Sequence, residues 1–431
     1  MIIEFAVTNF RSIKDRQVMD FRTDGQIGNK QMVDNIALPK DRSHGNSVVK
    51  TMAIYGANAS GKSNFLKALR ALEFMIINSE SLKLDKSIPI YEPFKLEKNN
   101  LKEPTIFEIE FIAHDKRRYR YEISFDKFTI LKEKLIFYEL DKKSSHFTLS
   151  FERNENRSIQ WKEQKDFALN PNQLLLSKVG TNDIPSIKEA YRFFSTHFFY
   201  GAAQSTSFDE AMLKFSEDIL SGEKVENLKL QKTVISIIKA ADVGITNIFT
   251  HELDTSKINL PEEMPEEDKV KILDRFKKRI KTIHTLYENG QEVGQSTFDL
   301  SEESTGTMKL VGLACIVADA LESGSVIIID EIDKNLHPLL TRMLVGLFHN
   351  AEFNKNDAQL IFSTHDVSLI DIKLFRRDQI MLIDKSQLGA SSVKRLSEFT
   401  GISRVVALEK WYLSGMFNAV PAINDYQIEM N

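Results

Sequence analysis

The sequence predicts an α/β fold that combines a parallel sheet with an antiparallel β-subdomain. Val48–Tyr55 is an apolar strand candidate, and Lys62–Ile77 carries apolar residues at the spacing of one helix face. Val326–Ile329 is apolar at every position, as expected of a strand covered on both faces of a parallel sheet. Polarity alternates over Thr105–Ala113 and Arg117–Phe125, and this period indicates an antiparallel hairpin. The two periods together favour a mixed fold over an all-helical or all-β one.

The composition is that of a folded protein with more than one domain. A length of 431 residues allows two to three domains, since one domain takes about 150 residues. Lysine and arginine number 57 against 61 for aspartate and glutamate, a net charge of -4. This balance excludes a protein that coats nucleic acid through global positive charge. The single cysteine, Cys315, cannot form an intramolecular disulfide, which suits a reducing compartment.

No targeting or membrane segment is expected. The first residues, MIIEFAVTNFRSIKD, lack the basic start and apolar stretch of a signal peptide. The most apolar long window, Leu310–Ile329, is interrupted by Asp319 and Glu322. It therefore cannot span a bilayer, which takes about 20 apolar residues. We expect a cytoplasmic protein without a membrane partner.

Changes in the hydrophobic period divide the chain into three expected segments. Residues 1–140 contain the first strands, the first helix and the β-subdomain. Residues 141–295 are expected to be mainly helical, with helices at Ile187–Phe199 and Val225–Ala240. This second segment ends in a hairpin that turns at an Asn-Gly dipeptide, a strong hairpin signal. Residues 296–431 return to alternating helices and strands.

A phosphate-binding loop is predicted between the third strand candidate and the first helix. Residues 56–63, GANASGKS, fit the pattern GxxxxGK[ST] between a strand and a helix. Gly56 and Gly61 let the loop wrap a phosphate, and backbone N–H groups at the helix N-terminus point at the anion. Lys62 offers a positive charge to the outer phosphates, and Ser63 a hydroxyl to Mg²⁺. The alternative, a glycine-rich turn that arose by chance, does not account for the flanking strand and helix.

Two carboxylates follow the buried strand of the last segment. Asp330 and Glu331 come directly after Val326–Ile329, at the strand edge where open α/β sheets bind ligands. We expect Asp330 to hold Mg²⁺ and Glu331 to polarise an attacking water. An acidic pair after a strand is by itself more often a helix cap. The phosphate loop in the same chain favours the catalytic interpretation.

Two further segments are candidates for contacts with a terminal phosphate. His365 follows the apolar run Leu360–Phe362, where its ring could donate a hydrogen bond, although a lone histidine there is more often structural. Ser304 and Gly306 precede a helix expected over Met308–Leu321, and a helix N-terminus favours anions. The alternative for this second segment is an ordinary capped helix start.

Taken in order, these motifs resemble the ABC-type ATPase superfamily, in its SMC/RecF-like branch. Within that branch the sequence looks most like the OLD-like ATPases of abortive-infection and other phage-defence modules. The resembling segments are NFRSIKD (Asn9–Asp15), IYGANASGKSNFLKAL (Ile54–Leu69), PF (Pro93–Phe94), ESTGTMKL (Glu303–Leu310), IIIDEIDKNLHP (Ile327–Pro338), FSTHD (Phe362–Asp366) and YLSGMF (Tyr412–Phe417).

The resemblance implies an ABC-type ATPase head, a P-loop NTPase with an antiparallel β-subdomain and a helical insertion, and it implies the cofactors ATP and Mg²⁺. Glu331 matches the catalytic base and His365 the switch histidine, while Ser63 and Asp330 match the Mg²⁺ ligands. Asn335 and His337 fall in the region of the family's D-loop. Residues matching ATP contacts are Gly56, Asn58, Ser60, Gly61, Lys62, Ser63 and Arg11, with Ser304 and Gly306 reaching the ATP of a second subunit.

Three departures from the family pattern bear on function. The signature reads Ser-Thr-Gly-Thr instead of Ser-Gly-Gly-Gln, a variation that OLD-like proteins share. No Q-loop glutamine is found around Pro93-Phe94. Many OLD proteins carry a Toprim nuclease after the switch histidine, but the residues after His365 contain no Asp-x-Asp pair. We therefore expect the effector to be a separate protein.

The leading functional hypothesis is an ATP-driven switch in anti-phage defence. Two heads would form a homodimer around ATP, each site completed by Ser304 and Gly306 of the other chain, and would control a separate nuclease or toxin. The alternative is a RecF-like DNA-binding repair ATPase that uses the basic residues at 116–120 and 269–281, although such runs are usually solvated faces. A third hypothesis is an RNase, since Arg192 and His197 have the Rx4H spacing of HEPN ribonucleases.

Overall fold

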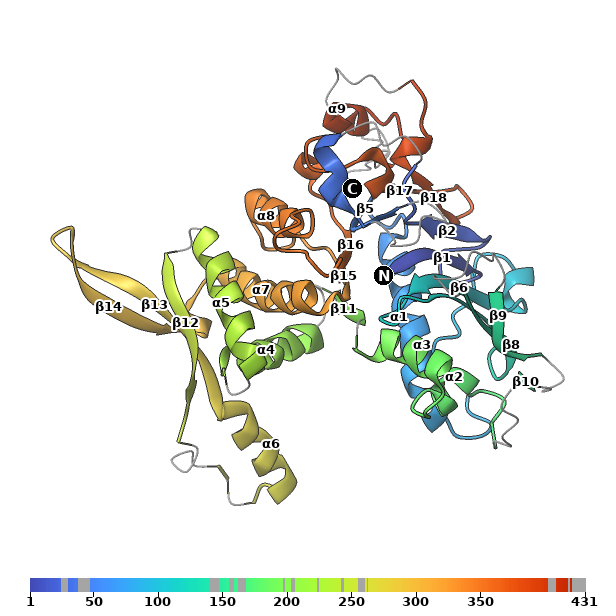
Figure 1. Cartoon of the computed structure of the whole chain (residues 1–431), viewed down its shortest axis with the longest axis horizontal. Coiled ribbons are helices and arrows are strands. Elements are labelled where there is room, and N and C mark those ends of the chain that lie inside the picture. The colour runs from blue at the N-terminus through green and yellow to red at the C-terminus, as the bar shows by residue number, and fades with distance from the viewer. Residues whose placement is uncertain are drawn as a thin grey trace, which may run out of the picture. The chain divides into compact units, whose positions relative to one another are not determined.

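The computed structural model describes two compact units (Figure 1). The first, unit 1, comprises residues 1–201, 323–332 and 345–431, and unit 2 comprises residues 202–322 and 333–344. The structure describes the whole chain apart from residues 25–29, 38–46, 139–146, 155–158, 162–167, 197, 203–205, 223–224, 242–243, 255–259, 262, 402–407, 418 and 421–431.

A six-stranded sheet forms the centre of unit 1. Its order is β11 (Phe198–Ala202), β15 (Val326–Asp330), β16 (Gln359–Ser363), β5 (Thr51–Gly56), β17 (Ile380–Lys385) and β18 (Ser391–Arg395). The four strands from β15 to β17 are parallel, and β18 returns antiparallel to β17. Every residue of β5, β15 and β16 is buried, which explains why these strands lack the alternation of a half-exposed sheet.

Helix α1 (Lys62–Asn78) begins directly after the glycine-rich loop and packs against β1, β5, β15 and β16. Phe65, Leu66, Leu69 and Leu72 recur at three- and four-residue spacing, so they lie on one side of the helix and are buried. The predicted helix over Lys62–Ile77 is confirmed.

The second sheet of unit 1 has seven antiparallel strands. Its order is β10 (Ile159–Trp161), β9 (Phe147–Arg153), β8 (Ile130–Tyr138), β7 (Arg118–Phe125), β6 (Thr105–Ile112), β1 (Ile2–Thr8) and β2 (Gln17–Asp20). The predicted β6–β7 hairpin is confirmed, with Thr105 opposite Phe125 and Ile112 opposite Arg118. One continuous cluster of buried apolar side chains joins this sheet to α1 and to the parallel sheet. The predicted α/β fold with an antiparallel β-subdomain is therefore confirmed.

Shorter elements complete unit 1. A two-stranded sheet pairs β3 (Ile36–Ala37) with β4 (Val48–Val49). The remaining helices are α2 (Leu175–Val179), α3 (Pro185–Thr196), α9 (Leu408–Leu413) and the end of α8 (Pro338–Phe348), with 3-10 turns at Lys30–Asn35, Ser79–Ser81, Asn99–Leu101, Val367–Leu369, Arg377–Gln379 and Leu396–Glu398.

Unit 2 combines helices with a three-stranded antiparallel sheet, in the order β12-β13-β14. The chain passes through α4 (Thr206–Leu220), α5 (Val225–Ala240), β12 (Ile245–Glu252), α6 (Glu266–Phe276), β13 (Lys278–Glu288), β14 (Gln291–Asp299), a 3-10 turn (Leu300–Glu302) and α7 (Thr305–Ser323). Helix α7 is buried along most of its length because small and apolar residues surround its axis.

Two sequence-based assignments were wrong. The helix expected over Ile187–Phe199 ends at Thr196, and Phe198 begins β11, where its ring packs against Phe193 and Phe194. The segment 141–295, expected to be mainly helical, also contains the strands β9, β10, β11 and β12. Strand β12 was missed because its pairing with β13 is non-local. The hairpin predicted across the Asn-Gly dipeptide is confirmed as β13–β14.

Among the residues that the structure describes, no helix is both long enough and apolar enough to cross a membrane.

His349 generates a prediction about the pH dependence of stability. It follows α8, and its Nε2 atom lies 2.7 Å from the hydroxyl of Thr51. Burial, and then the nearby Lys50, lower the pKa of His349 to about 3. Because an unfolded histidine has a pKa of about 6.5, the unfolded chain binds more protons between these two values. Stability is therefore lost as the pH falls from about 6.5 toward 3.

We expect the free energy of unfolding, measured in urea at pH 6.5 and pH 5, to fall by roughly 1–2 kcal/mol more in the wild type than in His349→Gln. Glutamine stays neutral and can still contact Thr51. Parallel pH profiles for the two proteins would contradict the assignment.

Candidate functional site

The glycine-rich loop between β5 and α1 is shaped by positions that tolerate no side chain. A Cβ atom at Gly56 would lie 2.5 Å from the carbonyl oxygen of Ile383. Gly61 has φ 114°, a conformation that L-residues rarely adopt, and a Cβ there would collide with the hydroxyl of Ser391. The loop is thereby held close to the β17–β18 hairpin, with the N-terminus of α1 at its end.

Polar groups inside this loop fit a bound phosphate. The buried Lys62 donates from Nζ to the carbonyl oxygens of Gly56 at 2.7 Å and Ala57 at 3.1 Å, so its charge lies within the loop. The hydroxyl of Ser60 is buried and, among the described residues, has no hydrogen-bond partner. A buried hydroxyl without a partner costs free energy, and a phosphate oxygen would supply one. Ser63 is half-buried at the start of α1, and Asn58 is exposed.

Two serines and a lysine that sequence reasoning missed hold the loop from outside. Ser391 Oγ donates to the carbonyl oxygen of Ser60 at 2.5 Å and lies 2.8 Å from Ser12 Oγ. Ser12 Oγ also accepts from the amide of Asn64 at 2.7 Å. Lys385 donates to the carbonyl oxygen of Ala59 at 3.0 Å. Ser12 lies inside the segment NFRSIKD, which was the only signal in the sequence that could have found it.

Arg11, predicted to approach the phosphates, has a carboxylate partner in this structure. Its guanidinium pairs with Glu92, and its backbone N–H donates to the carbonyl oxygen of Glu92 at 2.7 Å. Arg11 has φ 49°, in the left-handed region, so the turn that carries it also presents Ser12 to the loop. Its contact with phosphate stays a prediction.

The two predicted carboxylates lie at the end of β15, and one hydroxyl organises them. Ser363, at the end of the neighbouring β16, donates from Oγ to Asp330 Oδ1 at 2.5 Å. The Oγ atom of Ser363 also accepts a hydrogen bond from the backbone N–H of Glu331, at 2.8 Å. Glu331 has φ 55°, and the N–H of Ile332 donates to the carbonyl oxygen of Ser363 at 3.1 Å. Ser363 thus fixes the orientation of Asp330 and the strained backbone of Glu331.

His365 lies two residues beyond Ser363 and is exposed. The segment that carries it is held on β5, because the N–H of Thr364 donates to Ile54 at 3.2 Å and the hydroxyl of Tyr55 donates to Asp366 at 3.1 Å. Since β15, β16 and β5 are parallel neighbours, their carboxyl ends meet at one edge of the sheet. The structure therefore brings the phosphate loop, the two carboxylates and His365 to the same edge.

The predicted signature residues belong to unit 2. Ser304 is exposed, and its hydroxyl accepts the N–H of Thr307 at 3.1 Å, which caps the N-terminus of α7. A Cβ atom at Gly306 would lie 2.8 Å from the carbonyl oxygen of Asn335, whose φ is 62°. Gly306 is thus required where the segment around Asn335 approaches the helix start. Both Asn335 and His337 are exposed.

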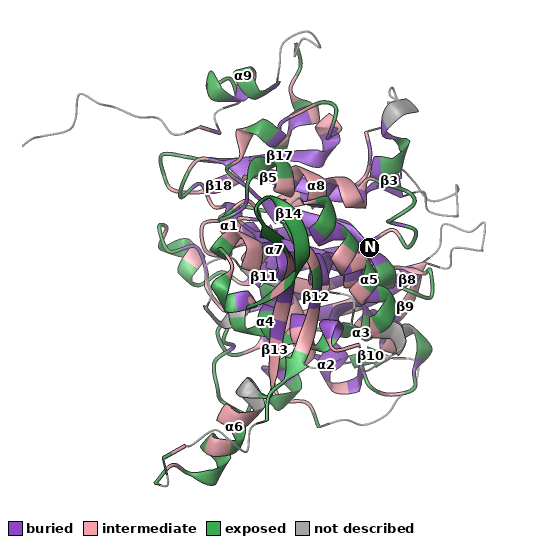
Figure 2. Cartoon of the chain, turned by 90° about the vertical axis from the view of Figure 1, so that its left-hand side faces the viewer, coloured by how far each residue is buried: buried purple, intermediate pink, exposed green. Residues whose placement is uncertain are grey.

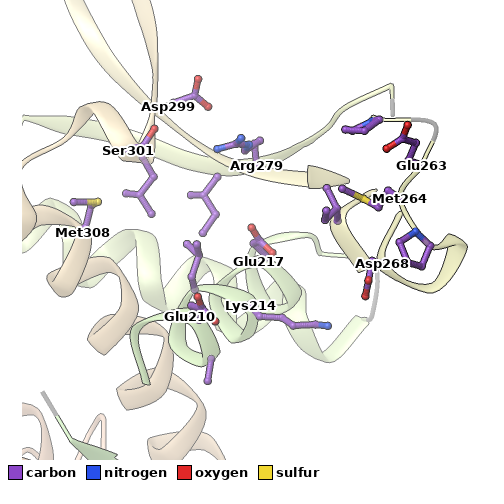
Figure 3. A pocket seen from close by; sticks show the side chains of 17 residues that line it. Glu210, Lys214, Glu217, Glu263, Met264, Asp268, Arg279, Asp299, Ser301 and Met308 are labelled. Carbon is purple, nitrogen blue, oxygen red and sulfur yellow. The ribbon is translucent and has the colours of Figure 1, made fainter. Parts of the chain in front are cut away.

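A groove of about 1410 Å³ borders the signature segment within unit 2 (Figure 3). This volume exceeds the roughly 300–1,000 Å³ typical of small-molecule pockets. Burial raises the pKa of Glu217, which faces it from α4. The charged and polar residues along the groove include Glu210, Lys214, Glu217, Arg279, Asp299 and Ser301. The N-terminal part of α7 therefore borders open space beside α4.

The basic segments considered for DNA binding have carboxylate partners. Arg118 pairs with Glu110, and Arg120 lies 3.3 Å from Glu108 on the neighbouring strand. In the second basic segment, Lys269 pairs with Glu266 at 2.9 Å and Lys281 with Asp299 at 2.9 Å. Of the pair considered for an RNase site, Arg192 lies 3.0 Å from Glu189 on α3, and His197 lies outside the described residues.

The donors at the sheet edge suit Mg²⁺ shared with a nucleotide. Within the described part of the chain, no group of three or more histidine, cysteine, aspartate or glutamate side chains could hold a metal. Mg²⁺ in nucleotide sites is bound through one or two protein ligands together with substrate phosphates and water. The hydroxyl of Ser63 and the carboxylate of Asp330 are ligands of this kind, so the residues present fit the ion.

Comparisons with known proteins identify a family. The family described as "AAA domain, putative AbiEii toxin, Type IV TA system" (AAA_21) matches residues 52–371. No curated protein matches the sequence.

Solved structures of SMC head domains are similar over nearly the whole chain. The SmcHead bound to the C-winged helix domain of ScpA is 14% identical, with a TM-score of 0.43, covering 96% of this chain and 99% of that one. The SMC head domain from Thermotoga maritima is 12% identical, with a TM-score of 0.39, covering 91% and 98%. A Pyrococcus furiosus Smc head with an extended coiled coil, bound to the C-terminal domain of ScpA, is 13% identical, with a TM-score of 0.41, covering 96% and 98%.

Ser363 generates the prediction for this site. We expect Ser363→Ala to lower magnesium-dependent ATP turnover by about 10- to 100-fold, the usual effect of losing a group that orients a metal ligand. Ser363→Thr keeps the hydroxyl and is expected to retain most of the activity. Steady-state turnover is measured over a range of Mg²⁺ concentrations. Ser368→Ala is the control, since Ser368 donates to Asp366 outside this cluster. Equal turnover in the alanine variant and the wild type would refute the role of Ser363.

Proposed function

This chain belongs to the AAA_21 family of AAA-domain proteins, and on that premise we propose that it is an ATP-driven molecular switch. The chain would dimerise around ATP, hydrolyse it and thereby control a separate effector protein. The single observation that carries this proposal is the convergence of the phosphate loop, Asp330, Glu331 and His365 at one edge of the parallel sheet.

In this proposal the loop binds the phosphates of ATP. Lys62 would turn its ammonium from Gly56 and Ala57 toward the outer phosphates, and the hydroxyl of Ser60 would gain an acceptor. Ser63 and Asp330 would hold Mg²⁺, which neutralises phosphate charge when bound. The loop is already in its left-handed conformation at Gly61, so little ordering is needed on binding.

Glu331 is the proposed general base. Its carboxylate would accept a proton from the water that attacks the terminal phosphorus, while the bond to the leaving oxygen breaks. Ser363 acts as a positioning residue, since its hydroxyl bonds both Asp330 and the N–H of Glu331. His365, exposed beside them, would donate a hydrogen bond to the terminal phosphate.

The signature residues support a dimer in which each subunit completes the other's site. Ser304 is exposed at the N-terminus of the 19-residue helix α7, where N–H groups and the helix dipole favour an anion. We propose that Ser304 and Gly306 of one subunit contact the ATP held by its partner. Closure on ATP and opening after hydrolysis would then be the two states of the switch.

The biological setting we propose is anti-phage defence in the cytoplasm, with a nuclease or toxin as the effector. The family description names a putative toxin of a type IV toxin–antitoxin system, and this wording supports the proposed setting. The described site accounts for ATP chemistry alone, so the toxic activity is assigned to a partner. The RecF-like alternative is not adopted, because Arg118 and Arg120 have the carboxylates of Glu110 and Glu108 beside them.

Glu331→Gln tests the catalytic assignment. We expect ATP hydrolysis to fall by about 10²–10⁴-fold, the contribution of a general base, while ATP binding persists and dimer accumulates. Phosphate release and light scattering with ATP measure the two effects. Lys62→Ala is the matched control, which should lose ATP affinity by calorimetry and stay monomeric. Hydrolysis at the wild-type rate in Glu331→Gln would exclude Glu331 as the base.

Mixing two inactive variants tests the shared site. Lys62→Ala has a damaged phosphate loop and an intact signature segment. Ser304→Arg has an intact phosphate loop and a damaged signature segment. A heterodimer of the two contains one intact composite site, so an equal mixture should recover ATPase activity that neither variant shows alone. No recovery in the mixture, although each variant is folded, would count against a site shared between subunits.

A further inference from the structure

The β13–β14 hairpin has a buried root and an exposed outer half. Its strands pair from Lys281 opposite Asp299 to Glu288 opposite Gln291 at the turn. At the root, Ile280 and Thr282 are buried, whereas nearly every residue from Leu286 onward through β14 is exposed (Figure 2). Figure 1 shows the hairpin extending beyond α4, α5 and α7, three helices of the same unit. The outer half is longer than a connection between two strands requires.

The outer half combines exposed apolar side chains with negative charge. The side chains of Leu286, Tyr287 and Val293, all within one short stretch, are 47%, 63% and 53% exposed. Glu288 and Glu292 lie beside them, and residues 282–298 contain no lysine or arginine. Successive residues of a strand point to opposite faces, so Leu286 and Tyr287 give each face of the hairpin an exposed apolar side chain. Exposed apolar side chains with charge beside them are typical of interaction surfaces.

The outer edge of the hairpin is also open to pairing. In the three-stranded sheet of the described chain, β14 has β13 as its neighbour on one side and none on the other. Proteins usually protect such an edge with lysine, proline or a bulge that twists it away. Strand β14 contains no lysine and no proline, but its register shifts between Gly294, opposite Leu286, and Glu292, opposite Tyr287, so that Val293 forms a bulge. The parts of β14 on either side of this bulge, and not its whole edge, offer backbone hydrogen-bonding groups to an added strand.

The root of the hairpin is bonded to the signature segment. The hydroxyl of Thr282 donates to Glu303 Oε1 at 2.6 Å, and His284 Nε2 lies 2.7 Å from the same oxygen. Glu303 directly precedes Ser304. The ring of His284 also packs edge-on against Phe298 of β14, at 5.1 Å between centroids. The carboxylate of Glu303, the residue before the signature serine, thus contacts two residues of β13, and the ring of His284 connects that strand to β14.

The connection along the chain from β14 to Ser304 is also short. Asp299 ends β14 and caps the 3-10 turn that leads to Ser304, with its N–H donating to Glu302 at 2.6 Å. A shift of the hairpin root would therefore move Glu303 and the start of α7 together.

We propose that the outer half of the hairpin, residues 285–295, is the docking surface for a separate partner protein, and that Glu303 connects its occupancy to the signature turn. The partner surface is apolar and rimmed by lysine or arginine. The coupling through Glu303 rests on the proposed role of Ser304, whereas the docking does not.

The negative charge of the outer half distinguishes between three possible binding partners: a nucleic acid, a second copy of this chain and another protein. Glu288 and Glu292 would repel the phosphates of a nucleic acid. A second copy of this hairpin would bring like carboxylates together, with no cation in residues 282–298 to offset them. A basic-rimmed protein surface gains complementary charge at the rim and buries Tyr287 at the centre, the residue type that dominates binding energy at interfaces.

The first experiment identifies what touches the hairpin in the source cells. Tyr287 is replaced by the photo-reactive residue benzoylphenylalanine in the full chain, and Leu388, 76% exposed in a turn of unit 1, is the matched control position. We expect an adduct with one other protein from position 287 and not from 388. An adduct with a second copy of this chain, with nucleic acid, or none above the control overturns the docking.

The second experiment uses that captured protein, purified, as the probe. We expect its affinity, measured by calorimetry, to weaken by about tenfold or more for Tyr287→Ala and for the double variant Glu288→Lys/Glu292→Lys. Glu252→Lys, which changes an exposed carboxylate on the opposite edge strand, should bind like the wild type. The hairpin variants should keep wild-type basal ATPase activity. Equal affinity of all four proteins overturns the docking.

The third experiment tests the coupling. The probe should change the ATPase rate of the wild type, and Glu303→Gln should still bind the probe while losing that change. An unchanged wild-type rate, or a change that persists in Glu303→Gln, overturns the coupling. A wild-type chain without any ATPase activity refutes the proposed function, while the binding measurements still decide the docking.

Discussion

The chemistry of this protein depends on the parallel order of three strands. Because β15, β16 and β5 run in the same direction as hydrogen-bonded neighbours, the residues that follow them meet at one edge. The middle strand β16 lies between the strand of the phosphate loop and that of Asp330 and Glu331. Its last residue, Ser363, bonds both carboxylate residues, and the segment after it is hydrogen-bonded to β5. A change in strand order would separate every one of these groups.

The edge is held in a conformation that the backbone would not adopt by itself. Ala59, Gly61 and Glu331 all have positive φ, and a non-glycine residue in that region costs about 1–3 kcal/mol. Two hydrogen bonds offset that strain: Lys385 donates to the carbonyl oxygen of Ala59, and the N–H of Glu331 donates to Ser363 Oγ. The loop and Glu331 are thus already organised in the structure, which would lower the entropic cost of nucleotide binding and of the proposed catalysis.

The sequence predicted the parts whose chemistry is local. The loop pattern, the apolar strand before Asp330 and the Asn-Gly turn each specify structure within a few residues, and all three were placed correctly. What it missed depends on contacts between distant segments. In the sequence, Ser363 belongs to the segment that carries His365, and its contact with Asp330 becomes visible only once β16 lies beside β15. Ser391 belongs to no sequence motif. Strand β12 and the end of α3 were missed for the same reason, since pairing and aromatic packing overrode local propensity.

The division of the chain into two units suggests how the state of the ATP site would be passed to the hairpin. The loop and carboxylates belong to unit 1, whereas Ser304, Gly306 and the β13–β14 hairpin belong to unit 2.

The chain passes from Glu331 through Ile332 directly into the second segment of unit 2. There Lys334 accepts a hydrogen bond from Lys309 of α7 at 2.7 Å, and Asn335 abuts Gly306 so closely that no Cβ fits between them. A displacement of Glu331 on hydrolysis would therefore reach the start of α7 through two residues of backbone. The same helix start is bonded through Glu303 to the hairpin, so in the proposed switch the catalytic state and the occupancy of the hairpin would act on one short turn.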